Sequence, residues 1–177
     1  MKQPDEQYSL ATKVLHWVSA LIIFVLIGVG LSLEDMADGP DKFRLIGLHK
    51  SFGVLLLLLL IIRIPVRLSN PVAPLPSYTR KDIVAAKALQ GLLYLMMLIM
   101  PVSGILMSQS AGHPVAMFGL ELPTLIGKSE GAHEFFEGVH GLSAWLLILL
   151  LAGHIGAALL HHFKLKDDTL KRMSFKK

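Results

Sequence analysis

Four histidines stand out because they lie within, or at the ends of, long apolar segments of this 177-residue chain. An ionisable side chain in hydrocarbon costs free energy, so such residues are candidates for a functional site. Imidazole serves there as a metal ligand or a proton carrier. A proton relay fits poorly, because no carboxylate lies deep within the same segments. The four candidate metal ligands are His16, His49, His140 and His154.

The spacing of these histidines predicts two groups at two membrane depths. His140 and His154 are 14 residues apart, and on a helix this step returns to within about 40° of the same face, about 21 Å further along. His49 lies near the same membrane face as His140. His16 lies near the opposite face, at the depth of His154. We therefore expect His49 to meet His140, and His16 to meet His154.

Two imidazoles at each depth match the axial ligation of two b-type haems in a helical bundle. Iron with both axial positions filled has no open site for oxygen chemistry, so electron transfer is the expected function. Two histidines per level are few for a closed zinc or copper site. The chain has no cysteine, which excludes thiolate metal sites and covalent attachment of a c-type haem.

The elements that must position these histidines are four apolar segments of roughly 18–26 residues. About 20 helical residues cross a hydrocarbon core of ~30 Å, and an open sheet would leave backbone donors unpaired in lipid. Hydrophobic residues make up 53% of the chain and charged residues only 17%. The sequence predicts an all-α membrane protein, a single domain over residues 1–177 whose four transmembrane helices span about 15–33, 45–64, 83–108 and 135–161.

The distribution of basic residues predicts the orientation of the bundle. Lysine and arginine are frequent in the connection between the second and third segments and in the C-terminal tail, and rarer in the other two connections. Basic loops stay in the cytoplasm, so we expect both termini there and the loop of residues 109–131 covering the outer end. The net charge of +4 fits this membrane pattern and requires no nucleic-acid partner. Thr79 and Asp82 form the pattern of a capping box before the third helix.

Arg63 follows His49 by the same 14-residue step, so it lies on the same stripe at the cytoplasmic level. There it could pair with a haem propionate, because guanidinium binds carboxylates well. A plain cytoplasmic anchor is an equally good interpretation. Lys50 and Arg44 could play the propionate role at the outer level, with weaker support.

The remaining four histidines are expected outside the hydrocarbon. His161 lies seven residues beyond His154, with His162 beside it, so both fall in the headgroup region near the cytoplasm. Surface exposure or a propionate contact is expected there rather than ligation. His113 and His133 fall in the predicted outer loop, where we expect them to be solvated.

The segments that carry these residues resemble the bacterial cytochrome b561 family over nearly the whole chain. They are VLHW around His16, GLHKSFG around His49, GVHGL around His140, GHIGAALLHHF around His154, and the ending HHFKLKDDTLKRM. The resemblance implies a multi-pass cytochrome of the bacterial inner membrane, with two b haems ligated at those four histidines. It also implies electron exchange with the quinone pool. Many members carry a histidine where this chain has Gln90, which leaves open the role of Gln90 in a propionate or quinone contact.

The function expected from the sequence is transfer of single electrons across or within the membrane, to or from ubiquinone, by way of two haems. The one-electron donor is unknown, and superoxide would be compatible with the exposed outer loops. One alternative is a cytochrome b subunit that anchors a larger oxidoreductase in the membrane. Another is a metal transporter without haem.

Overall fold

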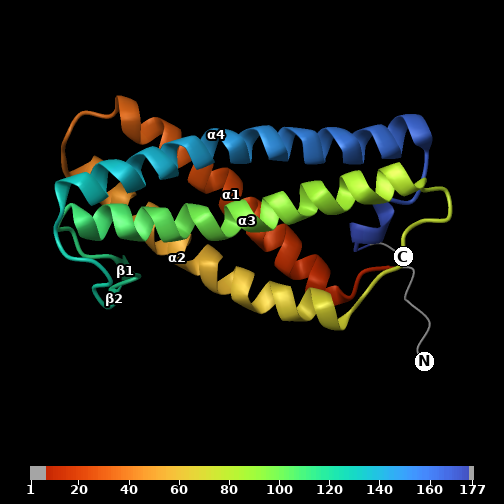
Figure 1. The fold of residues 1–177 in the computed structure, drawn as a ribbon, viewed down its shortest axis with the longest axis horizontal. Helices are drawn as coiled ribbons and strands as arrows, with labels where there is room; N and C mark the ends of the chain where they lie inside the picture. Colours follow the sequence, from red (N-terminus) through yellow and green to blue (C-terminus); the bar gives the residue numbers. More distant parts are fainter. Residues whose placement is uncertain (1–6, 176–177) are drawn as a thin grey trace.

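The apolar segments form four long helices in the computed structural model, which describes residues 7–175 (Figure 1). All four are long and apolar enough to cross a membrane. This confirms the prediction of an all-α membrane protein with four transmembrane helices. The helices are α1 (Leu10–Asp35), α2 (Pro40–Ser69), α3 (Arg80–Ser110) and α4 (Glu130–Leu160), followed by a π-helix (His161–Leu165) and a short 3₁₀ helix (Lys171–Met173).

Each helix begins before the apolar segment that predicted it. Polar side chains cap the starts of α1, α3 and α4, whereas α2 begins with Pro40 and has no side-chain cap. Ser9 and Ser129 accept hydrogen bonds from backbone N–H groups of the first turns of α1 and α4. Thr79 and Asp82 form the predicted capping box of α3. The helices are 26–31 residues long, whereas about 20 cross the hydrocarbon. Their ends therefore reach into the headgroup regions.

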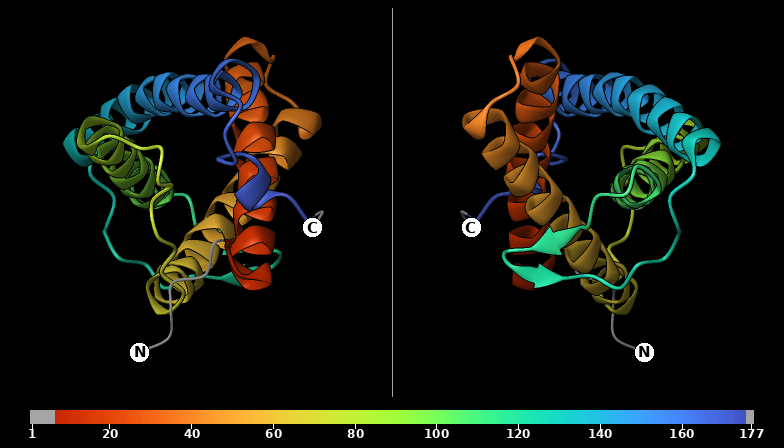
Figure 2. Two further views of the ribbon diagram at one scale, coloured as in Figure 1. Left: turned by 90° about the vertical axis from the view of Figure 1, so that its right-hand side faces the viewer. Right: turned by 90° about the vertical axis from the view of Figure 1, so that its left-hand side faces the viewer.

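The four helices run lengthwise around a common axis, as the end-on views of Figure 2 show. Over the described residues, the helix pairs that pack closely are α1 with α2, α2 with α3, and α3 with α4. The start of α1 and the end of α4 lie at the same end of the bundle (Figure 1), which we call the terminal end. The opposite end is the hairpin end. A mid-bundle core of Ile23, Leu56, Leu60, Met96, Met97 and Leu147 joins all four helices.

The loop between α3 and α4 contains a two-stranded hairpin, β1 (Ala116–Met117) with β2 (Leu120–Glu121). Its two turn residues, Phe118 and Gly119, have φ values of 50° and 92°, as a tight two-residue turn requires. Val115 is buried against α2 and α3. The hairpin lies beside α2 rather than only over the end of the bundle, because Ser51 bonds the carbonyl of Ala116 and the N–H of Phe118.

Candidate functional site

The structure brings the four candidate histidines together in two pairs, one near each end of the bundle. The ring centroids of His16 on α1 and His154 on α4 are 6.2 Å apart. Those of His49 on α2 and His140 on α4 are 6.3 Å apart. Metal–imidazole nitrogen bonds are about 2 Å, so two imidazoles on opposite sides of one metal have ring centroids about 6 Å apart. Both pairs have a separation that would suit one metal between two imidazoles.

A hydrogen bond to its Nδ1 atom orients the ring of His140. The backbone carbonyl of Met100 lies 3.0 Å from this nitrogen, and the Ser103 hydroxyl lies 3.2 Å away. A carbonyl can only accept, so Nδ1 carries the proton and donates it. The other ring nitrogen, Nε2, then keeps its lone pair free for a metal. Metal-bound histidines in proteins are typically held in this way.

Arg63 lies beside the pair at the terminal end. Its Nη2 donates to Nδ1 of His16 over 2.9 Å, and its guanidinium carbon lies 5.2 Å from the ring centre of Tyr94. A guanidinium can only donate, so Nδ1 of His16 is the acceptor in this arrangement. Arg63 thus reaches the level of His16 and His154 from a third helix.

Buried polar atoms without a partner are found beside both pairs. Nδ1 of His49 and Nε of Arg63 are buried and make no hydrogen bond in the described structure. The same holds for Oγ of Ser19, which lies one turn after His16 on α1. Unpaired buried polar atoms are rare in proteins and call for an explanation. A polar cofactor between the helices would supply one.

The glycines near the histidines leave space rather than bringing helix backbones close together. A Cβ atom built on Gly138, Gly141, Gly153 or Gly156 of α4 would meet nothing within 4 Å. Close packing through small residues would instead place a neighbouring helix there. Gly30 and Gly104 differ, because a Cβ on either would touch a histidine ring of the His49–His140 pair, at 3.4 Å and 3.1 Å. The glycine pattern fits a flat group beside α4.

The other histidines lie outside these pairs. His161 binds Asp167, and Nδ1 of His162 is buried without a partner. His113 is exposed in the loop before β1. His133 was expected in a solvated loop, but it lies in the first turn of α4 and its Nδ1 is 3.1 Å from the carbonyl of Met107. That expectation was wrong because the cap at Ser129 starts α4 before its apolar segment.

A cavity of about 300 Å³ lies beside His154 at the terminal end. Its polar lining includes Gln90, the hydroxyl of Tyr78 and His161. Tyr78 and Thr169 share a hydrogen bond of 2.5 Å across this cavity, from the middle loop to the C-terminal tail. Gln90, which the sequence had singled out without a role, therefore lies in the same cavity as a candidate ligand.

Asp167 ties the C-terminal tail to the end of α4, and this attachment is expected to fail in acid. Burial raises the pKa of Asp167, but the hydrogen bonds of Thr169 and His161 outweigh it and hold the pKa below its ordinary value. The attachment is therefore complete above the ordinary aspartate pKa of about 3.9 and is lost as pH falls through the lower folded value. The protection of residues 166–175 against hydrogen exchange, corrected for the intrinsic exchange rate at each pH, measures this. Asp167→Asn should lower that protection at neutral pH and remove its pH dependence; an unchanged protection profile would contradict the assignment.

Comparisons with known proteins agree with this arrangement. A family model described as prokaryotic cytochrome b561 matches residues 7–176. Cytochrome b561 homolog 2 of Escherichia coli K12 is 36% identical over 171 residues, covering 95% of this chain and 91% of its own length. Cytochrome b562 of Cereibacter sphaeroides is 32% identical over 94% of each chain. The Yersinia pestis protein named "Probable superoxide oxidase CybB" is 29% identical over 97% of this chain and 98% of its own.

The fold and the comparisons define a class, the membrane cytochromes b that carry electrons in the bacterial inner membrane. The chain belongs to the prokaryotic cytochrome b561 family. Membership implies that the protein binds haem b.

Proposed function

We propose that each histidine pair ligates one haem b, one held by His49 and His140 and the other by His16 and His154. The observation that carries this proposal is the nearly equal separation of the two ring pairs, 6.3 Å and 6.2 Å. Both values suit one metal between two imidazoles. Among the described residues, no group of three or more histidine, cysteine or acidic side chains is arranged to hold a metal ion, so each pair would rely on two protein ligands.

Haem bound in this way supplies reversible one-electron chemistry, and the protein supplies ligands, spacing and an apolar surrounding. The carbonyl of Met100 fixes the ring of His140 for ligation through Nε2. Ligation of His16 through Nε2 would place its proton on Nδ1. Arg63 would then no longer find an acceptor there, and its charge would be available to a propionate. This is the role that we propose for Arg63.

We further propose that electrons pass between a donor outside and the quinone pool, with the terminal end in the cytoplasm. The basic middle loop and tail support that orientation. The cavity beside His154 could take a quinone head group, because the amide of Gln90 in its lining offers a hydrogen-bond donor to a carbonyl oxygen. Superoxide is a candidate donor, prompted by the name of the Yersinia pestis relative. Each superoxide would lose one electron to become O₂, and each ubiquinone would take up two electrons and two protons.

Haem content tests the central proposal. Pyridine extraction of the purified protein is expected to give about two haems b per chain, and a reduced-minus-oxidised spectrum should show two b-type α-bands. A single haem per chain would eliminate one of the two sites. Absence of haem after expression with an ample supply would favour the alternative of a metal transporter.

Quinol oxidation tests the alternative of an anchor subunit. The purified chain alone should become reduced by a soluble ubiquinol analogue, or should pass electrons from a superoxide source to the quinone. A subunit that needs a larger oxidoreductase for its electrons would do neither when isolated. Reduction by quinol without any response to superoxide would keep the quinone proposal and remove superoxide as donor.

A further inference from the structure

We propose that a second pocket, at the hairpin end, binds the phosphate of a membrane phospholipid. This pocket, of about 560 Å³, lies between the first turns of α2 and the loop that carries the hairpin. It uses the face of α2 that bears Gly47 and Ser51. His49 does not line it, because on a helix that residue points about 160° away from Gly47. None of the four candidate haem ligands lines this pocket.

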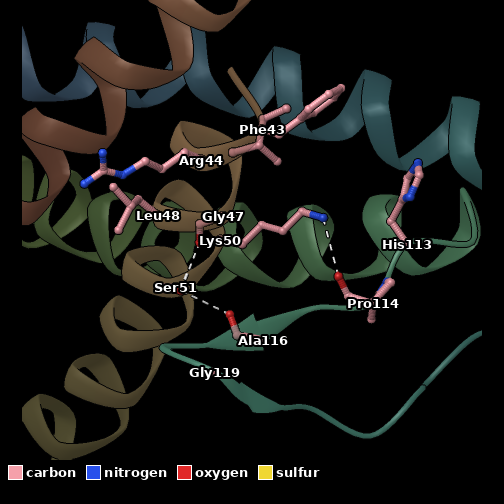
Figure 3. Close-up of a pocket in the computed structure, with 11 residues that line it drawn as sticks. Phe43, Arg44, Gly47, Leu48, Lys50, Ser51, His113, Pro114, Ala116 and Gly119 are labelled. Carbon is pink, nitrogen blue, oxygen red and sulfur yellow. Dashed lines mark hydrogen bonds between the residues drawn. The ribbon is translucent and has the colours of Figure 1, made fainter. Parts of the chain in front are cut away.

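The lining of the pocket combines cations with apolar surface. Figure 3 shows Lys50 extending from α2 toward the loop and His113 on the loop side of the same opening. Arg44 also lines the pocket, about two turns nearer than Lys50 to the start of α2. The apolar part includes Phe43 and Leu48. No acidic residue lines the pocket, so its chemistry suits an anionic group attached to an apolar body.

The charge of Lys50 has no counterion among the residues that the structure describes. Among residues 7–175, its hydrogen bond runs to the carbonyl of Pro114 over 3.5 Å, and no carboxylate lies within 4 Å of its amine. Lys50 is ten residues into α2, about 15 Å along the axis, and α2 is about 15 Å longer than the hydrocarbon core. A half-buried lysine at this depth extends its amine toward the headgroup level, where an anion can pair with it.

The surroundings of the pocket indicate that this anion belongs to a lipid. Beside the pocket, Phe118 and Leu120 of the hairpin are 57% and 68% exposed. Ser51 holds the hairpin at the depth of Lys50, where lipid rather than water would cover such side chains. Phe43, which is 63% exposed, continues this apolar surface along α2. A phospholipid would place its phosphate at Lys50 and its chains along these residues.

Native mass spectrometry of the delipidated holoprotein tests the proposal. It is titrated with dioleoylphosphatidylglycerol, with dioleoylglycerol, which lacks the phosphate, and with inorganic phosphate. We expect one tightly bound phosphatidylglycerol molecule per chain, which dioleoylglycerol does not displace. The Lys50→Gln variant should bind phosphatidylglycerol about tenfold more weakly. Lys42→Gln is the matched control, because Lys42 also lies near this end but is paired with Asp38. It should bind the phospholipid like the unmodified protein.

Three results would overturn the proposal. The first is unchanged phospholipid binding by Lys50→Gln. The second is inorganic phosphate binding as tightly as the phospholipid, which would identify a site for free anions. The third is a shift in haem midpoint potential in Lys50→Gln with phospholipid binding retained, which would assign Lys50 to a propionate. Arg44→Gln provides a second variant of the same pocket and should weaken phospholipid binding in the same direction.

Discussion

Replacing His154 by alanine is expected to halve the haem content of the purified protein. His154 faces His16 at 6.2 Å between ring centroids, and a haem there would keep only one protein ligand after the change. The pair of His49 and His140 lies about 21 Å away along α4 and shares no ligand with it. Pyridine extraction and the α-bands of the reduced protein measure the loss. Transfer of electrons through the protein should stop, because one of the two haems that would carry them is missing.

His133→Ala is the matched control, since it removes an imidazole from the same helix. His133 contacts the carbonyl of Met107 and belongs to neither pair, so this variant should retain both haems. His154→Ala would contradict the proposed ligation if it kept its full haem content. Loss of both haems with normal folding would show that the two sites are not independent.

Replacing Gly104 by valine is expected to remove or displace the other haem. A Cβ atom at this position of α3 would lie 3.1 Å from Cε1 and 3.3 Å from Nδ1 of His140. Carbon atoms in contact lie at about 3.5–4.0 Å, so the ring would have to move, and the extra branches of valine add to the strain. Overpacking of this kind costs about 1–3 kcal/mol of folding stability. It would also break the alignment of His140 with the carbonyl of Met100.

Two measurements separate these effects of Gly104→Val. Haem content and the α-band of the haem proposed at His49 and His140 report on the site, and thermal unfolding reports on stability. Gly91→Val on the same helix is the control, because a Cβ there meets nothing within 4 Å. Gly91→Val should keep both haems. A Gly104→Val protein with two unperturbed α-bands would show that the ring of His140 is free to shift without leaving its ligand position.

Part of the site could be predicted because a helix converts sequence spacing into depth. The step from His140 to His154 fixes two levels on α4, since each residue adds 1.5 Å and about 100°. The apolar segments also predicted the number of helices, because each is long enough to cross the hydrocarbon core once as a helix. The helices were predicted to begin too late in the sequence, because caps such as Ser9 and Ser129 lie outside the apolar segments.

Other features had no signal in the sequence. The acceptor that orients His140 is a backbone carbonyl on α3, and every residue has such a carbonyl. The loop carbonyl that lies near the amine of Lys50, that of Pro114, is likewise a backbone atom without a sequence signal. The hairpin has strands of only two residues, too short for any alternation of apolar and polar residues to show.

The sequence by itself determined that four helices cross the membrane and that imidazoles occur at two levels. Periodicity and length are local properties of each helix, and they hold whatever its neighbours are. Depth along the helices already suggested the two pairings. Only the tertiary structure shows how close the paired rings come, that the glycines of α4 border open space, and that Arg63 reaches His16. The rotation of each helix about its axis and the distance to its neighbour depend on how the side chains of all four helices pack together.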